Sequence, residues 1–110
     1  MRTSTTAILA RNAHWSGRVA TEPYEAGWAS EALVFVRALK TPTLTHGDAF
    51  VEISPDGMHW IREGSRFALP RRKDEVGFVR IRHFGNWLRV AAELPQGAAI
   101  VVLVTLHLKS

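Results

Sequence analysis

Alternation of apolar and polar residues constrains the fold of this chain more than any other feature. The run of residues 76–84 shows it most clearly, because side chains in an extended strand point to opposite faces in turn. One face receives Val79, Ile81 and His83, and the other receives Phe78, Arg80, Arg82 and Phe84. The same period of two recurs along the chain, and no segment has convincing helical periodicity. The pattern predicts an all-β protein.

Turn residues separate the alternating runs at intervals of about eight to twelve residues. Predicted strands occupy residues 6–11, 14–20, 31–39, 49–53, 58–63, 65–69, 76–84, 87–94 and 98–108, with loops at 21–27 and 71–75. The run 31–39 has apolar residues on both faces, so we expect it in the middle of a sheet. About eight short strands with regular turns are typical of a single antiparallel β-sandwich, jelly-roll-like in its connections.

Length and composition are those of one globular domain. The chain has 110 residues, of which 46% are hydrophobic and 22% charged, and we expect one domain over 1–110 with residues 1–5 flexible. The absence of cysteine excludes disulfides and thiolate metal sites. The amino terminus has only a four-residue apolar run, which is too short for a signal-peptide core, and no window approaches the length of a membrane helix, so we expect a cytoplasmic protein without a membrane partner.

Positive charge is concentrated between residues 58 and 90. This stretch holds eight Lys or Arg and three Asp or Glu, while the whole chain has a formal net charge of +4. Such an excess attracts nucleic acid or an acidic protein, although arginines also serve simply as the solvent side of exposed strands. The candidates for an interface or for contact with anions are Arg62, Arg66, Arg71, Arg72, Arg80, Arg82 and Arg89.

The motif Ser54-Pro55-Asp56-Gly57 predicts a tight corner between two strands. Proline has the φ of the second position of a type I turn, Asp56 can bond to its own backbone, and Gly57 accepts the left-handed conformation. We therefore expect a hairpin with a bulge, with Trp60 covering the end of the core. The candidate ligand contacts in this corner and in the loop before residue 31 are Tyr24, Trp28, His59 and Trp60.

The last predicted strand is apolar on both faces over residues 100–104. A strand of this kind either lies in the centre of its sheet or has its outer face covered by another subunit. At about 25 cal/mol per Å² of apolar surface removed from water, covering several hundred Å² supplies several kcal/mol of association free energy before entropy is subtracted. Self-association is therefore one expectation.

Two segments resemble a known class of proteins. They are the strand that ends in Ser54-Pro55-Asp56-Gly57, with Trp60 after it, and the later segment Phe84-Gly85-Asn86-Trp87-Leu88-Arg89-Val90. Both are similar to small β-sandwich proteins of phage and prophage virions and, more distantly, to discoidin-type binding sandwiches. The resemblance covers the C-terminal half of the chain. The virion resemblance implies a non-enzymatic building block that assembles with copies of itself, and the discoidin-type resemblance transfers no binding residue.

The sequence carries no signature of an enzyme. It has no Gly-x-Ser-x-Gly motif, no phosphate-binding glycine loop and no pair of histidines at metal-ligand spacing. We therefore predict no catalytic residue, no metal and no cofactor. The first hypothesis is a structural protein that forms a homo-oligomer, virion-like or shell-like. The second is a carbohydrate- or peptide-binding module, and the third is single-stranded nucleic-acid binding through the basic region 58–90.

Overall fold

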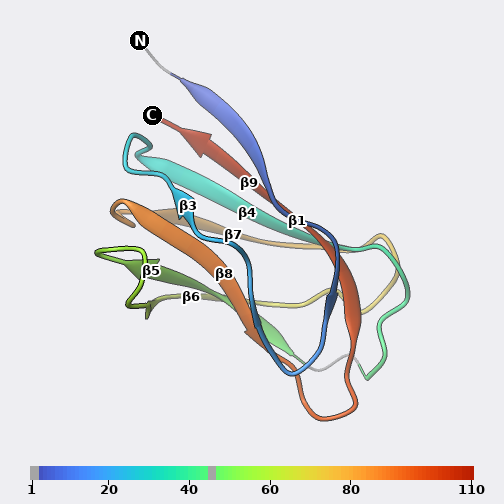
Figure 1. The fold of residues 1–110 in the computed structure, drawn as a ribbon. Coiled ribbons are helices and arrows are strands. Elements are labelled where there is room, and N and C mark those ends of the chain that lie inside the picture. The colour runs from blue at the N-terminus through green and yellow to red at the C-terminus, as the bar shows by residue number, and fades with distance from the viewer. Residues whose placement is uncertain (1–2, 45–46) are drawn as a thin grey trace.

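The computed structural model describes residues 3–44 and 47–110 and contains, within these residues, nine strands in two antiparallel sheets (Figure 1). The predicted all-β class and the single β-sandwich are confirmed. No helix in the described part of the chain is long and apolar enough to span a membrane. The strands are β1 (Ser4–Trp15), β2 (Arg18–Ala20), β3 (Tyr24–Glu25), β4 (Glu31–Ala38), β5 (Asp48–Ser54), β6 (Ile61–Ala68), β7 (Val76–Arg82), β8 (Trp87–Glu93) and β9 (Ile100–Lys109).

The connections between strands follow a jelly-roll course. One sheet has the order β1-β9-β4-β7 and the other the order β2-β8-β5-β6, with β3 also paired to β8. The antiparallel pairs are nested, because β1 pairs with β9, β2 with β8, β4 with β7 and β5 with β6. This is the course of one long hairpin rolled into two layers. Its innermost turn is the loop 55–60, so the predicted corner lies at the tip of the rolled hairpin.

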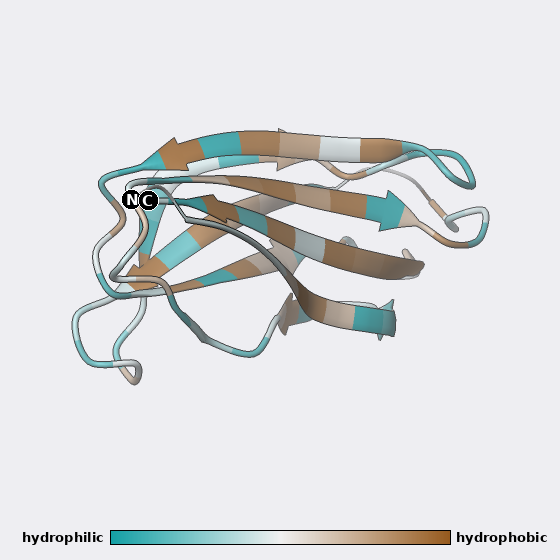
Figure 2. Ribbon diagram, turned by 90° about the horizontal axis from the view of Figure 1, so that it is seen from above, coloured by the Kyte–Doolittle hydropathy of each residue, from teal (hydrophilic) through white to brown (hydrophobic). Residues whose placement is uncertain are grey.

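The core lies between the two sheets and is built from one set of alternating side chains on each strand. Val34 and Val36 of β4 are fully buried, as are Val51 of β5, Val90 of β8 and Leu106 of β9. Hydrophobic stretches lie along the strands of both layers in Figure 2, with hydrophilic residues between them and in the loops. The expected central position of 31–39 is confirmed, since β4 lies between β9 and β7. Of the two alternatives for the last strand, the central position holds, since β9 lies between β1 and β4.

The predicted strand 14–20 is divided between the two sheets. β1 ends at Trp15 and β2 begins at Arg18, because Gly17, with φ of 64°, turns the chain from one sheet into the other. β1 also begins earlier than predicted. Ser4 and Thr5, in the segment that we expected to be flexible, pair with β9 as part of the sheet, while residues 1 and 2 lie outside the described residues.

A short strand lies where we predicted only a loop. β3 falls within residues 21–27 and pairs with the first residues of β8, so β2 and β3 are two pieces of one interrupted edge. Thr21 bridges the interruption, because its amide donates to the carbonyl of Val90 at 2.8 Å and its hydroxyl accepts from the amide of Val90 at 3.1 Å. The hydroxyl of Thr21 thus takes the place of a backbone acceptor in the ladder. The alternation of residues in the sequence gives no sign of such a substitution.

The two short strands predicted at 58–63 and 65–69 are joined in the single strand β6, which begins only at Ile61, so residues 58–60 belong to the corner loop. The pairing of β6 with β5 shifts register between Phe50 and Glu52, which marks a β-bulge. Gly64 lies within β6 at φ of 117°. Two extra residues lie on β6 at this irregularity, because Phe50 pairs with Arg66 and Glu52 pairs with Arg62, so the alternation of burial continues along the strand. The prediction divided the strand at Gly64.

Candidate functional site

The two outer faces of the sandwich differ in how their charges are paired. On the sheet β2-β8-β5-β6, ion pairs neutralise the candidate arginines. Arg66 pairs with Asp48 at 2.6 Å, and Arg62 pairs with Glu93 at 3.2 Å. The guanidinium of Arg62 also lies 3.9 Å from the centroid of the Phe50 ring. These arginines are therefore occupied within the sheet, and they offer little charge to an external anion.

Arg89 belongs to the same neutralised face. It pairs with Glu52 at 2.7 Å, and its guanidinium lies 4.4 Å from the centroid of the Trp60 ring. The expectation that Trp60 covers the end of the core is therefore wrong. Trp60 is half-buried beneath Arg89, whereas the large rings buried in the core are Trp15 and Phe84.

The outer face of the sheet β1-β9-β4-β7 carries instead an apolar patch. The register places Ile8, Thr105, Phe35 and Phe78 in one row across the four strands, because paired residues point to the same side of a sheet. Leu103, Arg37 and Val76 form the next row. Ile8, Val76 and Phe78 are each 46% exposed. We define the apolar patch as Ile8, Phe35, Val76, Phe78 and Leu103.

Aromatic contacts hold the centre of the apolar patch. The rings of Phe35 and Phe78 stack with centroids 6.0 Å apart and an interplanar angle of 28°. The ring of His107 meets Phe35 edge-on at 4.9 Å. Arg80 lies with its guanidinium 5.3 Å from the centroid of Phe78. Stacked rings of this kind form a stiff platform, which is typical of the centre of a binding surface.

One end of this outer face is basic. Arg80, Arg82 and Lys109, which we call the basic end, line a hollow of about 370 Å³ together with His107 and Glu31. In the described residues no ion pair joins Arg80, Arg82 or Lys109 to an acid. Of the seven arginines that the sequence singled out, Arg80 and Arg82 are thus the two on the apolar face that keep their charge unpaired.

The loop between β6 and β7 holds Arg71 and Arg72. Both are exposed, and Arg71 donates its backbone amide to the Glu75 carboxylate at 3.0 Å. In the same loop Asp74 accepts a hydrogen bond from Arg37 of β4 at 2.8 Å, and this bond holds the pKa of Asp74 below its ordinary value of 3.8. The loop is therefore tied to the sheet and adds positive charge at the edge of β7.

The corner at the tip of the rolled hairpin is held by two side chains. The hydroxyl of Ser54 accepts from the amides of Asp56 and Gly57, at 3.2 and 2.8 Å. The Asp56 carboxylate accepts from the amides of Met58 and His59, at 2.8 and 2.9 Å. The bond from the His59 amide, followed by the bond from Met58, depresses the pKa of Asp56 far below its ordinary 3.8. These hydrogen bonds give Ser54 and Asp56 a structural role in the corner.

The four candidate ligand contacts have separate neighbours. Tyr24 lies in β3 and packs against the core, and Trp60 stacks with Arg89. The ring of His59 bonds to the Asp56 carboxylate at 2.6 Å. Trp28 is 43% exposed in the loop before β4. Each of Tyr24, His59 and Trp60 thus has a structural contact within its own segment or sheet.

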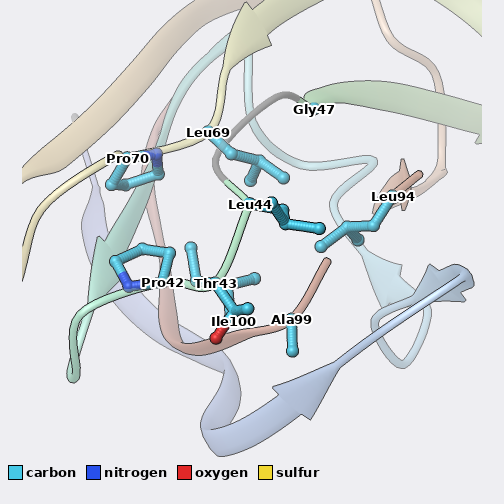
Figure 3. Close-up of a pocket in the computed structure, with 9 residues that line it drawn as sticks. All are labelled: Pro42, Thr43, Leu44, Gly47, Leu69, Pro70, Leu94, Ala99 and Ile100. Carbon is cyan, nitrogen blue, oxygen red and sulfur yellow. The ribbon is translucent and has the colours of Figure 1, made fainter. Parts of the chain in front are cut away.

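One further concave feature, a crevice beside the loop before β5, is too small for a larger ligand. Figure 3 shows this crevice, in which the side chains of Leu44, Leu69 and Leu94 point toward one another. Its volume is about 10 Å³, which is close to the space of one water molecule. Among residues 3–44 and 47–110, no group of three or more His, Cys, Asp or Glu side chains converges as a metal site would require.

Comparison with known proteins shows the fold alone. No family model and no curated protein matches the chain. The prophage SPBc2-derived protein YomS has a similar structure, with a TM-score of 0.66 and 8% identity over 100% of this chain and 96% of that chain. A chain in the structure of infectious bursal disease virus, Gx strain, is similar with a TM-score of 0.53 and 11% identity, over 98% of this chain and 32% of that chain. The resemblance to β-sandwiches of prophage and viral proteins is therefore supported for the fold.

Proposed function

We propose that this chain is a non-enzymatic structural subunit that associates with copies of itself, as a component of a virion-like or shell-like particle. The apolar patch is the observation that supports this most directly. It lies on an open sheet face, has stacked phenylalanines at its centre and has arginines at its rim, which is the usual anatomy of a protein interface. The folds shared with a prophage-derived protein and a virus chain agree with such a role.

The energetics of the patch favour a protein partner over solvent. Ile8, Val76 and Phe78 expose nearly half of their surface, although they lie in regular strands whose other faces are buried. Covering them removes apolar surface from water at about 25 cal/mol per Å², and the rings lose little entropy because they already stack. Covering the outer face of the sheet β2-β8-β5-β6 supplies much less association free energy, because the ion pairs on that face would have to be desolvated.

The decisive experiment compares the oligomeric state of the wild type with that of Phe78→Asp. Native mass spectrometry and light scattering, from low to high micromolar concentration, should show a discrete oligomer for the wild type and a monomer for the variant. A charge at the centre of a contact must be desolvated, so it weakens association strongly. Because Phe78 is exposed, the variant should keep its fold, which far-ultraviolet circular dichroism checks.

Met58→Asp is the matched control, because Met58 is an apolar side chain that is 74% exposed but lies in the corner loop, outside the patch. We expect it to assemble like the wild type. A wild-type chain that stays monomeric over the whole concentration range would contradict the proposed function. An oligomer that Phe78→Asp leaves unchanged would show that the subunits meet through a surface other than the apolar patch.

A second candidate function is single-stranded nucleic-acid binding on the same face. The stacked rings of Phe35 and Phe78 stand beside Arg80 and Arg82, and single-strand binders combine rings and cations in this way. Binding of a labelled oligonucleotide, measured by fluorescence anisotropy, should then weaken steeply as salt rises. It should also be lost in Phe78→Asp. Absence of binding at low salt would exclude this candidate.

A further inference from the structure

We propose that the subunits meet head-to-tail, with the basic end of one copy receiving an acidic edge of the next. The acidic edge consists of Glu22 and Glu25, at the interrupted strand edge formed by β2 and β3. This inference rests on the proposed self-association and specifies the two surfaces that form it. The partner is a second copy of this chain, and it is recognised by charge complementarity.

The acidic edge is exposed and its charges are not used within the subunit. In the described residues neither Glu22 nor Glu25 takes part in an ion pair or a side-chain hydrogen bond, and both are exposed. The other acids outside the basic end do have such a bond. They are Asp48, Glu52, Asp56, Glu63, Asp74, Glu75 and Glu93. Glu22 and Glu25 thus remain as the acids available to a cation from outside.

The two surfaces lie at opposite lateral edges of the sandwich. Arg80 and Arg82 are on β7, the edge strand of one sheet, and β7 lies against β6 of the other sheet. Glu25 is on β3, which together with β2 forms the opposite edge of the sheet that ends in β6. A subunit therefore carries a basic surface on one side and an acidic surface on the other. Tyr24 packs on the core, so Glu25 points away from the core, on the outer face of its own sheet. Copies stacked in the same orientation, with the β2-β3 edge of one over the outer face of β7 of the other, bring the two surfaces together.

The surfaces also lie at the same end of the sandwich. Residues 83–86 connect the end of β7 to the start of β8, so these two strand ends lie at the same end of the sandwich (Figure 1). Glu25 pairs directly with Trp87. The next copy can therefore meet Arg80 and Arg82 with Glu22 and Glu25 without sliding along the strand direction.

A contact between two different surfaces has a defined consequence for assembly. Such heterologous contacts generate closed rings when the rotation between copies closes, and open filaments when it does not. The edge of the next copy would lie over Phe78, which is next to Arg80 on the outer face. In this arrangement the apolar patch supplies most of the binding free energy, and the charges orient the copies.

Charge reversal on each surface tests the proposal. We expect Arg80→Glu with Arg82→Glu to raise the dissociation constant of the oligomer about tenfold or more, and Glu22→Lys with Glu25→Lys to do the same, because like charges then face each other. Rising salt should weaken the wild-type oligomer for the same reason. The matched control is Arg71→Glu with Arg72→Glu, which changes the net charge equally but lies outside both surfaces. We expect this control to assemble like the wild type.

The critical variant combines Arg80→Glu and Arg82→Glu with Glu22→Lys and Glu25→Lys in one chain. A head-to-tail contact predicts that the combined variant, with both charges reversed, recovers assembly to within a few fold of the wild type, because the two surfaces are complementary again. A face-to-face contact predicts that Glu22→Lys with Glu25→Lys has no effect and that the combined variant stays monomeric.

These outcomes separate the inference from the proposed function. If the wild type assembles and the acidic-edge variant assembles equally well, the head-to-tail contact is wrong while self-association stands. If the wild type is a monomer at every concentration, self-association fails and the head-to-tail contact fails with it. An oligonucleotide that binds the monomeric wild type at low salt would instead assign the basic end to nucleic acid.

Discussion

At the scale of single residues, the corner at the tip of the hairpin depends on the ionised form of Asp56. Backbone amides donate to its carboxylate and depress its pKa, so the contribution to stability is complete above the ordinary pKa of 3.8 and is lost as the pH falls below it. We predict that the melting temperature of the wild type falls more steeply than that of Asp56→Asn between pH 5 and pH 2. Calorimetry over this range measures it, and parallel curves would contradict the prediction.

Gly77 is a second residue whose identity follows from its surroundings. A Cβ at this position would lie 2.8 Å from the carbonyl oxygen of Ala68 and 3.3 Å from the Phe67 ring, where β6 and β7 approach each other. We predict that Gly77→Ala lowers the free energy of unfolding by about 1–3 kcal/mol, because the added methyl group can be accommodated only if the backbone of β6 at Ala68 shifts.

Urea denaturation measures this change, and Gly17→Asn is its control. Nothing lies within 4 Å of a Cβ at Gly17, and asparagine tolerates the φ of 64° found there. The control should change the free energy of unfolding by less than about 1 kcal/mol. Equal effects at the two positions would show that crowding at Gly77 is not the cause.

At the scale of elements, the ion pair between β5 and β8 matters more than its neighbours. The side chains of Glu52 and Arg89 are only 15% and 26% exposed, whereas those of Asp48 and Arg66 are 42% and 69% exposed. We predict that Arg89→Ala lowers the free energy of unfolding by about 1–3 kcal/mol, because it leaves a half-buried carboxylate without its partner and uncovers Trp60. Arg66→Ala should cost less than about 1 kcal/mol.

Urea denaturation of the two variants and of Glu52→Gln with Arg89→Ala provides the check. The double variant should be less destabilised than the sum of its single changes, because an unpaired charge no longer remains in the sheet. Equal effects of Arg89→Ala and Arg66→Ala would contradict a special role for the β5–β8 pair.

The elements also show where sequence reasoning stops. Alternation predicted seven of the strand positions in outline, but it interrupted β1 at residues 12–13, joined the end of β1 to β2, split β6 and omitted β3. Each error lies where the chain changes sheet, bulges or bonds through a side chain, as at Gly17, Gly64 and Thr21. Such features are produced by neighbouring strands, and a single run of residues does not contain them.

At the scale of the whole molecule, nested pairing makes folding slow. The outermost pair joins β1 to β9, so residues from the two ends of the chain must meet, as Thr5 does with Leu108. Topologies rich in distant contacts lose much chain entropy before those contacts form. We predict refolding in the range of milliseconds to seconds, followed by stopped-flow fluorescence of the buried Trp15, which is 4% exposed. Refolding in microseconds would contradict this.

The candidate interface was visible in the sequence only in part. The run 76–84 already placed Phe78, Arg80 and Arg82 on one face, and the structure confirms that this face is the outer one. The same run placed Phe84 there too, and this was wrong: β7 ends at Arg82, His83 has a φ of 57°, and Phe84 is buried in the core. Phe35 and His107 were missed, although the second set of side chains on 31–39 was a signal that could have identified Phe35. Their proximity to Phe78 depends on the register of β4 with both β7 and β9.

Alternation and turn chemistry act between residues close along the chain, and they were enough to predict the class of the fold, the central position of β4 and the corner at Ser54–Gly57. Which arginines keep a free charge could not be predicted in this way, because it depends on the neighbours that each arginine has in the folded sheets. Arg62, Arg66 and Arg89 resemble Arg80 and Arg82 in the sequence, but strand pairing places acids beside the first three and stacked rings beside Arg80. Charge pairing is a property of contacts between strands, and those contacts follow from the order in which the rolled hairpin packs.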